Sequence, residues 1–282
     1  MEIIDVVDTM KFRADQVRNM NQKIAFVPTM GFLHEGHLAL LDKGKHIADH
    51  LVLSIFVNPT QFSQTEDYTI YPKNLEKDLS LAEQYGVDTV FTPDKETMYP
   101  SNYQSYVYLE HLPNFLCGRS RPTHFKGVTT IVTKLFNIVK PHYAIFGEKD
   151  YQQLAIIRHM VRDLNMDIQV IGLPIVREAD GLAMSSRNSY LNPEQRKIAC
   201  CLYQCITLAK KMVASGEKNA STIIETASNH IRSYIETRID YLNISNTETL
   251  EDIKIIDQPA LFALAVYVGK TRLIDNTILN PL

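Results

Sequence analysis

Short apolar runs alternate with helix-like segments over about the first 170 residues, and this alternation constrains the fold more than any other feature. The near-continuous apolar runs, which are typical of buried strands, lie at 23–28, 50–59, 88–93, 142–150 and 167–176. The segments between several of them repeat apolar residues with the period of a helix. Strands that alternate with helices predict an α/β fold, with a Rossmann-like parallel sheet covered by helices on both faces.

The pattern changes near residue 175. A polar, turn-like segment at 177–195 is followed by sequences typical of helices at 193–213 and 219–238. The sequences at 239–245 and 260–276 are typical of strands. We therefore predict two closely packed domains: a Rossmann-like domain over 1–175 and a smaller α+β domain over 176–282.

Charge and apolar content exclude several classes of protein. The 29 basic and 32 acidic residues are interspersed and give a net charge of -3, which disfavours nucleic acid as a partner. No apolar run approaches the roughly 18 residues of a membrane span, and the N-terminus lacks a secretory signal pattern. We expect a soluble cytoplasmic protein without a membrane partner.

The four cysteines have no C-x-x-C spacing, which predicts reduced, buried thiols. Cys201 and Cys205 are four residues apart, but no histidine or second cysteine pair lies nearby to complete a zinc site. A structural zinc ion is therefore not expected.

Polar clusters directly follow three of the predicted strands: "PTMGFLHEGH" at 28–37, "VNPTQF" at 57–62 and "FGEKDYQQ" at 146–153. In an open parallel sheet, ligands bind beyond the carboxyl ends of the strands. We expect these three clusters to gather at one rim of the sheet.

The first cluster holds two histidines, His34 and His37, where a strand leads into a helix. Zinc proteases of the H-E-x-x-H type need histidines four residues apart, but the residue four after His34 is Leu38. A helix N-terminus instead favours an anion such as phosphate, and Gly31 and Gly36 would let it approach the backbone. An ordinary strand-to-helix turn with capping or packed histidines remains the alternative.

Two other segments offer groups that suit phosphate. Ser185, Ser186 and Arg187 supply two hydroxyls and a guanidinium group, and Lys149 follows a glycine turn. Each has a simpler interpretation, because serine-rich segments are usually turns and a single lysine is usually solvated.

Together, the H-x-G-H turn and the later M-S-S-R segment resemble the HIGH and KMSKS motifs of the nucleotidyltransferase superfamily, with Arg187 where synthetases carry lysine. Five segments in order, "VPTMGFLHEGHLAL", "SIFVNPTQF", "RPTHFKGV", "FGEKDYQQL" and "READGLAMSSRN", resemble the pantothenate synthetase (pantoate-β-alanine ligase) family more narrowly. The ending "AVYVGKTRLIDN" at 265–276 is similar too. One local variation is Phe32, where a small residue is common.

The resemblance implies ATP-dependent ligation of (R)-pantoate and β-alanine to pantothenate through a pantoyl adenylate, with release of AMP and diphosphate. It also implies Mg²⁺ held mainly by ATP phosphates, a homodimer, and a C-terminal domain that acts as a lid. His37 takes the position of the family's proton donor, and we expect its main work to be hydrogen bonding to phosphate. The implied catalytic residues are His34, His37, Lys149, Ser185, Ser186 and Arg187. The implied ATP-binding residues are Met30, Gly31, Phe32, Leu33, His34, Glu35, Gly36, His37, Gly147, Glu148, Lys149, Asp150, Val176, Met184, Ser185, Ser186 and Arg187.

Gln61 and Gln153 match the family's pantoate ligands, and Gln61 also lies near the β-alanine site. Arg119 or Arg121 could close over the nucleotide, and Cys117 has no assigned role. The alternatives are a nucleotidyltransferase acting on a phosphate monoester, a tRNA-charging enzyme and a non-catalytic nucleotide-binding protein. Neutral glutamines disfavour the first, since a phosphate acceptor calls for arginine or lysine.

Overall fold

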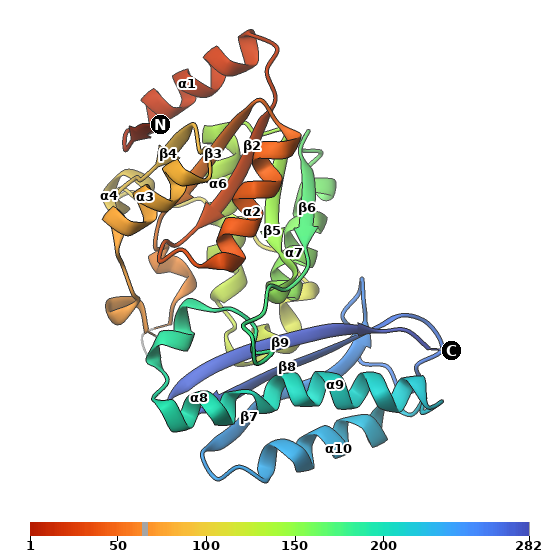
Figure 1. Cartoon of the computed structure of the whole chain (residues 1–282). Coiled ribbons are helices and arrows are strands. Elements are labelled where there is room, and N and C mark those ends of the chain that lie inside the picture. The colour runs from red at the N-terminus through yellow and green to blue at the C-terminus, as the bar shows by residue number, and fades with distance from the viewer. Residues whose placement is uncertain (64–66, 282) are drawn as a thin grey trace. The chain divides into compact units, whose positions relative to one another are not determined.

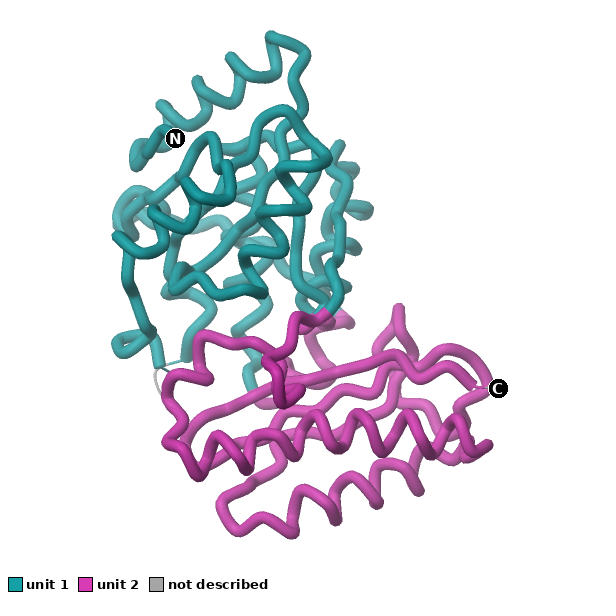
Figure 2. The backbone as a smooth tube through the Cα atoms, in the orientation of Figure 1, with its two compact units in different colours: residues 1–110, 121–148, 153–174 teal, residues 111–120, 149–152, 175–282 magenta. Residues whose placement is uncertain are grey.

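The computed structural model describes residues 1–63 and 67–281, and the chain divides into two compact units (Figure 2). Unit 1 comprises residues 1–110, 121–148 and 153–174. Unit 2 comprises residues 111–120, 149–152 and 175–282. The chain therefore leaves unit 1 twice before residue 175 and returns each time.

Unit 1 contains the predicted parallel sheet. Its six strands are ordered β1-β4-β3-β2-β5-β6, and every adjacent pair is parallel. The strands are β1 (Glu2–Ile4), β2 (Ile24–Thr29), β3 (His50–Ile55), β4 (Thr89–Phe91), β5 (Tyr143–Gly147) and β6 (Gln169–Leu173). Five of them overlap the predicted apolar runs, with β2 extending one residue further to Thr29, and the α/β class is confirmed. Strand β1 and the helix after it were not predicted.

Helices lie on both faces of this sheet, with α2 in front and α6 behind in Figure 1. The central strand β2 is fully buried from Ile24 to Val27, because β3 and β5 flank its edges and helices cover its faces. The α-helices with residues in unit 1 are α1 (Val7–Asn19), α2 (Glu35–Ile47), α3 (Leu75–Gln84), α4 (Lys95–Met98), α6 (His124–Val139) and α7 (Tyr151–Asp163), whose first two residues belong to unit 2. Two 3-10 helices, η1 (Pro59–Gln61) and η2 (Asp67–Ile70), follow β3.

Unit 2 is built on an antiparallel sheet of three strands in the order β7-β8-β9. The strands are β7 (Thr237–Asn246), β8 (Ala260–Val268) and β9 (Thr271–Leu279). Helices α9 (Cys201–Ala214) and α10 (Ala220–Arg232) run side by side along the sheet (Figure 1). Cys201 and Cys205 are fully buried between these layers, and the four cysteines form no disulfide.

Two helix boundaries in unit 2 differ from the sequence-based expectation. The segment expected as one helix forms α8 (Pro193–Ala199) and α9, with Cys200 between them. The next expected helix ends at Arg232 rather than Arg238, because Thr237 and Arg238 pair with Val268 and Tyr267 in the sheet. Pairing with a neighbouring strand overrides a local preference for helix at this position.

The short segment 111–120 belongs to unit 2 because side chains of that unit bind its backbone. It contains η3 (Leu112–Asn114) and α5 (Leu116–Ser120). The buried Gln152 donates hydrogen bonds to the carbonyls of Leu112 (2.9 Å) and Phe115 (2.8 Å), and its Oε1 accepts the Cys117 N–H (2.9 Å). Every helix in the described part of the chain is too short or too polar to cross a lipid bilayer.

Candidate active site

The β2–α2 loop places both histidines at the start of a helix, as predicted. His34 is the N-cap of α2, and its Nδ1 accepts the Gly36 N–H at 3.2 Å. The Nδ1 of His37 accepts the His34 N–H at 3.3 Å, and the two ring centroids are 4.1 Å apart. Because both Nδ1 atoms accept, each neutral ring carries its proton on Nε2. The histidines do cap the helix, and the capping makes each Nε2–H a hydrogen-bond donor.

The residues just before the histidines have an unusual backbone conformation. Gly31 (φ 81°) and Phe32 (φ 54°) both lie in the left-handed region, which disfavours a side chain such as that of Phe32. Asp78 of α3 stabilises this loop, because its carboxylate accepts the N–H groups of Phe32 (2.8 Å) and Leu33 (2.7 Å). A Cβ atom at Gly31 would lie 2.9 Å from Asp78 Oδ2, so only glycine fits there without a shift.

Asp78 is only 2% exposed, and burial raises the pKa of its carboxyl group, although the two backbone hydrogen bonds oppose this shift. Sequence reasoning did not find Asp78. It lies 41 residues beyond His37 in an ordinary amphipathic helix, where an aspartate gives no sign of facing inward.

Gln61 lies beside the same loop, with its amide oriented by a buried neighbour. Its Oε1 accepts a hydrogen bond from Asn58 Nδ2 (3.0 Å), and its Nε2 lies 3.3 Å from Met30 Sδ. Asn58 is 1% exposed and also donates to the Gly127 carbonyl (3.1 Å) and accepts the Tyr99 hydroxyl (2.8 Å). The structure thus brings Met30 and Gln61 together and directs the amide N–H of Gln61 away from Asn58.

The side chains of His124 and Arg121 both form hydrogen bonds with the backbone carbonyl of Gln61. His124 Nδ1 donates to this oxygen at 2.9 Å, and a guanidinium nitrogen of Arg121 lies 3.3 Å from it. Arg121 also donates to His124 Nε2 (3.2 Å), which fixes the histidine proton on Nδ1. Arg119 belongs to unit 2, where it pairs with Asp252 at 3.5 Å. Closure of either arginine over a nucleotide stays a prediction.

The "FGEKD" cluster is divided between the two units. Gly147 and Glu148 belong to unit 1, and Lys149 and Asp150 belong to unit 2. A Cβ atom added at Gly147 would meet nothing within 4 Å, so the backbone faces open space there. Gln153, the other predicted pantoate ligand, lies half-buried on α7 in unit 1.

Within unit 2, Lys149 lies beside the predicted 184–187 motif. Its ammonium group donates to the Met184 carbonyl at 3.2 Å, and the Met184 N–H donates to the Val176 carbonyl at 3.0 Å. Ser185 caps the 3-10 helix η5 (Ser186–Tyr190) by accepting the Arg187 N–H at 3.3 Å. The structure therefore brings together the predicted ATP-site residues that unit 2 carries at 149, 176 and 184–187.

A buried ion pair holds the segment that leads to the 184–187 motif. Arg177 forms two hydrogen bonds with Asp275 of β9, at 2.7 and 2.9 Å, and a third with the Gly181 carbonyl at 3.0 Å. The Arg177 guanidinium lies 4.6 Å from the centroid of the Tyr203 ring. The Asp275 side chain is fully buried, which raises the pKa of its carboxyl group against the opposing effect of Arg177. Sequence reasoning did not find this pair, because its members are 98 residues apart.

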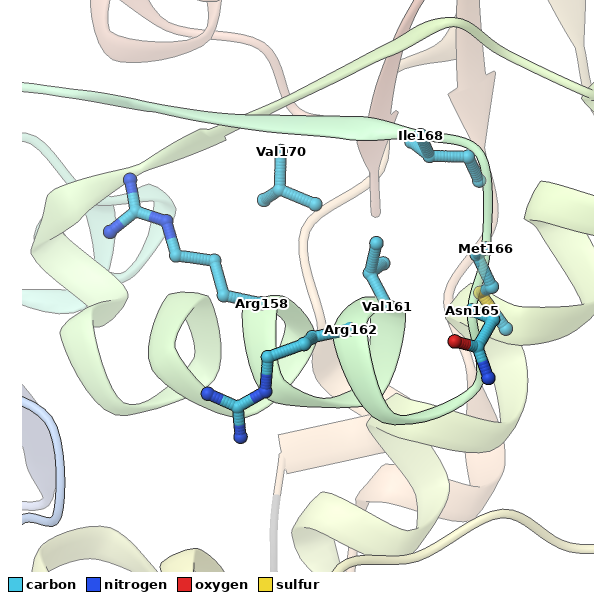
Figure 3. A pocket seen from close by; sticks show the side chains of 7 residues that line it. All are labelled: Arg158, Val161, Arg162, Asn165, Met166, Ile168 and Val170. Carbon is cyan, nitrogen blue, oxygen red and sulfur yellow. The ribbon is translucent and has the colours of Figure 1, made fainter.

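An open hollow of about 320 Å³ in unit 1 contains none of the predicted site residues (Figure 3). It lies between α7 and β6 and is lined by Arg158, Val161, Arg162, Asn165, Met166, Ile168 and Val170. Among the described residues, no three or more His, Cys, Asp or Glu side chains are grouped so as to hold a metal ion.

Comparison with known proteins shows the family of the chain. A sequence model of the family described as pantoate-beta-alanine ligase matches residues 2–278. The chain is 57% identical to pantothenate synthetase from Desulfatibacillum aliphaticivorans, over 100% of both chains. It is 52% identical to the Thermotoga neapolitana pantothenate synthetase, over 99% of this chain and 100% of the relative.

Solved structures show the same likeness. The crystal structure of pantothenate synthetase from Thermus thermophilus matches with a TM-score of 0.95 at 41% identity, covering 100% of both chains. The Francisella tularensis pantoate-beta-alanine ligase, complexed with beta-gamma ATP and beta-alanine, matches with a TM-score of 0.83 at 33% identity, covering 99% of this chain and 97% of that one. The family identified from sequence motifs is thus confirmed, and this chain belongs to the pantoate-β-alanine ligase family.

Proposed function

We propose that this protein joins (R)-pantoate to β-alanine in two steps. The pantoate carboxylate first attacks the α-phosphorus of ATP, which forms pantoyl adenylate and releases diphosphate. The β-alanine amine then attacks the acyl carbon, so that the C–N bond forms, the bond to AMP breaks and the amine loses a proton. The family membership of the whole chain supports this reaction.

The observation that carries the proposal is the pair of capping histidines. Attack on the α-phosphorus builds negative charge on the phosphate oxygens and on the departing diphosphate. The Nε2–H groups of His34 and His37 are donors held at a helix N-terminus, where an anion is favoured. We propose that they donate to phosphate oxygens as this charge develops.

Unit 2 supplies the cations and hydroxyls of the proposed ATP site. Lys149 would exchange its bond to the Met184 carbonyl for one to a phosphate oxygen, and Arg187 would add a second cation. Ser185 and Ser186 contribute hydroxyl donors. The remaining ATP-binding residues are those implied at 30–37, 147–150, 176 and 184.

The two glutamines are the proposed pantoate ligands. A neutral amide offers both a donor and an acceptor, which suits a substrate with hydroxyl groups and a carboxylate. Since Asn58 occupies the Gln61 oxygen, Gln61 would use its Nε2–H toward the substrate. A ligase of this kind differs from a phosphate-monoester transferase, whose acceptor site needs arginine or lysine.

Mg²⁺ is proposed to bind mainly through ATP phosphates and water. It would neutralise phosphate charge, a task for which hard oxygen ligands from the nucleotide suffice. We also propose that the domain over 176–282 acts as a lid that protects the adenylate from water, and that the enzyme is a cytoplasmic homodimer.

The test is pantoate-dependent exchange of labelled diphosphate into ATP, followed by AMP formation when β-alanine is added. We expect exchange only with pantoate and AMP release only with both substrates. Absence of exchange in folded protein, or exchange driven by a phosphate monoester instead, would refute the proposed reaction.

A further inference from the structure

We propose that Asn276 of β9 is a positioning residue that sets the place of Lys149, and this rests on the phosphate-binding role proposed for that lysine. Asn276 is 6% exposed, and its side-chain Nδ2 donates a hydrogen bond to the Lys149 backbone carbonyl at 2.8 Å. The two residues are 127 positions apart in the sequence. The bond therefore links the C-terminal strand to a loop from the middle of the chain.

Lys149 needs such a tie because its own backbone has little regular structure. It lies in η4 (Glu148–Asp150), a single 3-10 turn between β5 and α7. The residues on both sides, up to 148 and from 153, belong to unit 1. Since the lysine side chain is flexible, a fixed backbone carbonyl sets the region that the ammonium group can reach, and the bond to the Met184 carbonyl then selects its place.

Asn276 is itself held firmly. Its N–H donates to Asp275 Oδ1 at 2.8 Å, and it pairs with Ala263 of the central strand β8. Asp275 in turn binds Arg177, at the start of the hairpin that leads to Met184. Two successive residues of β9 thus hold the two segments that are joined by the bond from the Lys149 ammonium group to the Met184 backbone carbonyl. This gives a physical role to the "LIDN" part of the C-terminal motif.

The experiment compares Asn276→Ala and the near-isosteric Asn276→Leu with Lys149→Ala and with the double variant Lys149→Ala/Asn276→Ala. Asn243→Ala is the matched control, because Asn243 is on β7 of the same sheet and donates to Asp252 rather than to a site segment. Folding is checked by circular dichroism and thermal unfolding. The readout is the rate of pantoate-dependent exchange of diphosphate into ATP.

We expect Lys149→Ala to lower the exchange rate by about 10²-fold, the scale for loss of one group that stabilises transition-state charge. Both Asn276 variants should lower it by about 10-fold or more, since a misplaced group loses much of its effect. In the Lys149→Ala background, Asn276→Ala should change the rate less than about twofold, because both changes remove one interaction.

Three results would overturn the inference. Near-normal exchange in both Asn276 variants, with a slow Lys149→Ala enzyme, would refute only the role of Asn276. Losses that multiply in the double variant would show that Asn276 acts independently of Lys149. Normal exchange in Lys149→Ala would refute the role proposed for that lysine as well.

Discussion

Each unit uses a buried aspartate to hold a loop of the proposed ATP site, but the two aspartates have different partners. In unit 1, Asp78 accepts two backbone N–H groups, and no ion pair to it occurs among the described residues. In unit 2, Asp275 forms a two-bond ion pair with Arg177. One carboxylate therefore binds peptide groups, whereas the other binds a full positive charge.

The difference follows from how each loop is assembled. The unit 1 residues at 30–37 are contiguous and lead directly into a helix, so a carboxylate on the peptide groups is enough to hold their left-handed turn. The unit 2 residues come from two separate segments, which need ties between distant parts of the chain. We expect changes at the unit 2 aspartate to cost mainly stability and changes at the unit 1 aspartate to cost mainly activity.

The largest expected effect is from Arg177→Leu, which leaves the fully buried Asp275 without its partner. An unpaired buried charge costs about 3–5 kcal/mol of folding free energy. The double variant Arg177→Leu/Asp275→Leu should recover part of this loss, because it removes both charges. Urea unfolding of the three variants measures the effect, and a loss below about 1 kcal/mol in Arg177→Leu would contradict it.

The second largest effect is expected from His37→Ala. It should lower the rate of adenylate formation by about 10²–10³-fold, the usual cost of losing one donor to transition-state charge. The melting temperature should change less than the rate does, since His37 is half-buried in the first turn of α2 and outside its buried face. His46→Ala, at the exposed C-terminal end of the same helix, is the control. A large fall in melting temperature with normal turnover would make His37 purely structural.

Asp78→Asn tests the role of the buried aspartate in unit 1. An amide has one acceptor oxygen and cannot accept both N–H groups as a carboxylate does, so the 31–33 turn should loosen. We expect the KM for ATP to rise by about tenfold, the equivalent of one charge-assisted hydrogen bond, with a smaller loss of stability than in Arg177→Leu. Steady-state kinetics measures this.

The matched control is Asp94→Asn, since Asp94 caps α4 by accepting the Thr97 N–H in the same unit. An equal rise of KM in both variants would show that the effect is not specific to the loop.

The smallest expected effect concerns pH. His50 is buried with its Nε2 2.9 Å from Thr89 Oγ1, and burial lowers its pKa below the usual 6.5. The unfolded chain therefore takes up a proton first as the pH falls through 6.5, and the free energy of unfolding should fall with it. His50→Gln should make this fall shallower, as followed by urea unfolding between pH 7 and 5.

The raised pKa values of Asp78 and Asp275 affect stability in the opposite direction to that of His50. The folded state binds these protons more readily than the unfolded chain, so the free energy of unfolding gains from their uptake as the pH falls. Protonation of these carboxyl groups should therefore offset part of the acid destabilisation. A stability curve for His50→Gln that matches the wild-type curve would contradict the role given to His50.

The sequence predicted the parallel sheet because its strands are buried on both faces and read as continuous apolar runs. It also indicated the groups proposed to bind phosphate, since 30–37 and 184–187 are compact motifs whose chemistry is local. Strand β1, by contrast, is an edge strand of three residues with two exposed side chains, and so carries no such signal.

The supports of the site could not be predicted in this way. Asp78, Asn58 and Asp275 are ordinary polar residues in the sequence, and only folding shows that they are buried and bonded to a loop. Asp78 binds N–H groups 45 and 46 residues away, and Asp275 binds an arginine 98 residues away, at separations with no periodic relation to any element. Motifs thus indicate the groups that are proposed to act, whereas the groups that orient them depend on tertiary structure.

The division of the chain into units has a consequence for synthesis on the ribosome. Residues 1–174 contain all six strands of the parallel sheet, so unit 1 can form before translation ends. Segments 111–120 and 149–152 emerge in the same period, but β7, β8 and β9 are made last. The two segments can bind each other early through Gln152, but Lys149 must wait for Asn276, its partner on β9, until the C-terminal sheet is made.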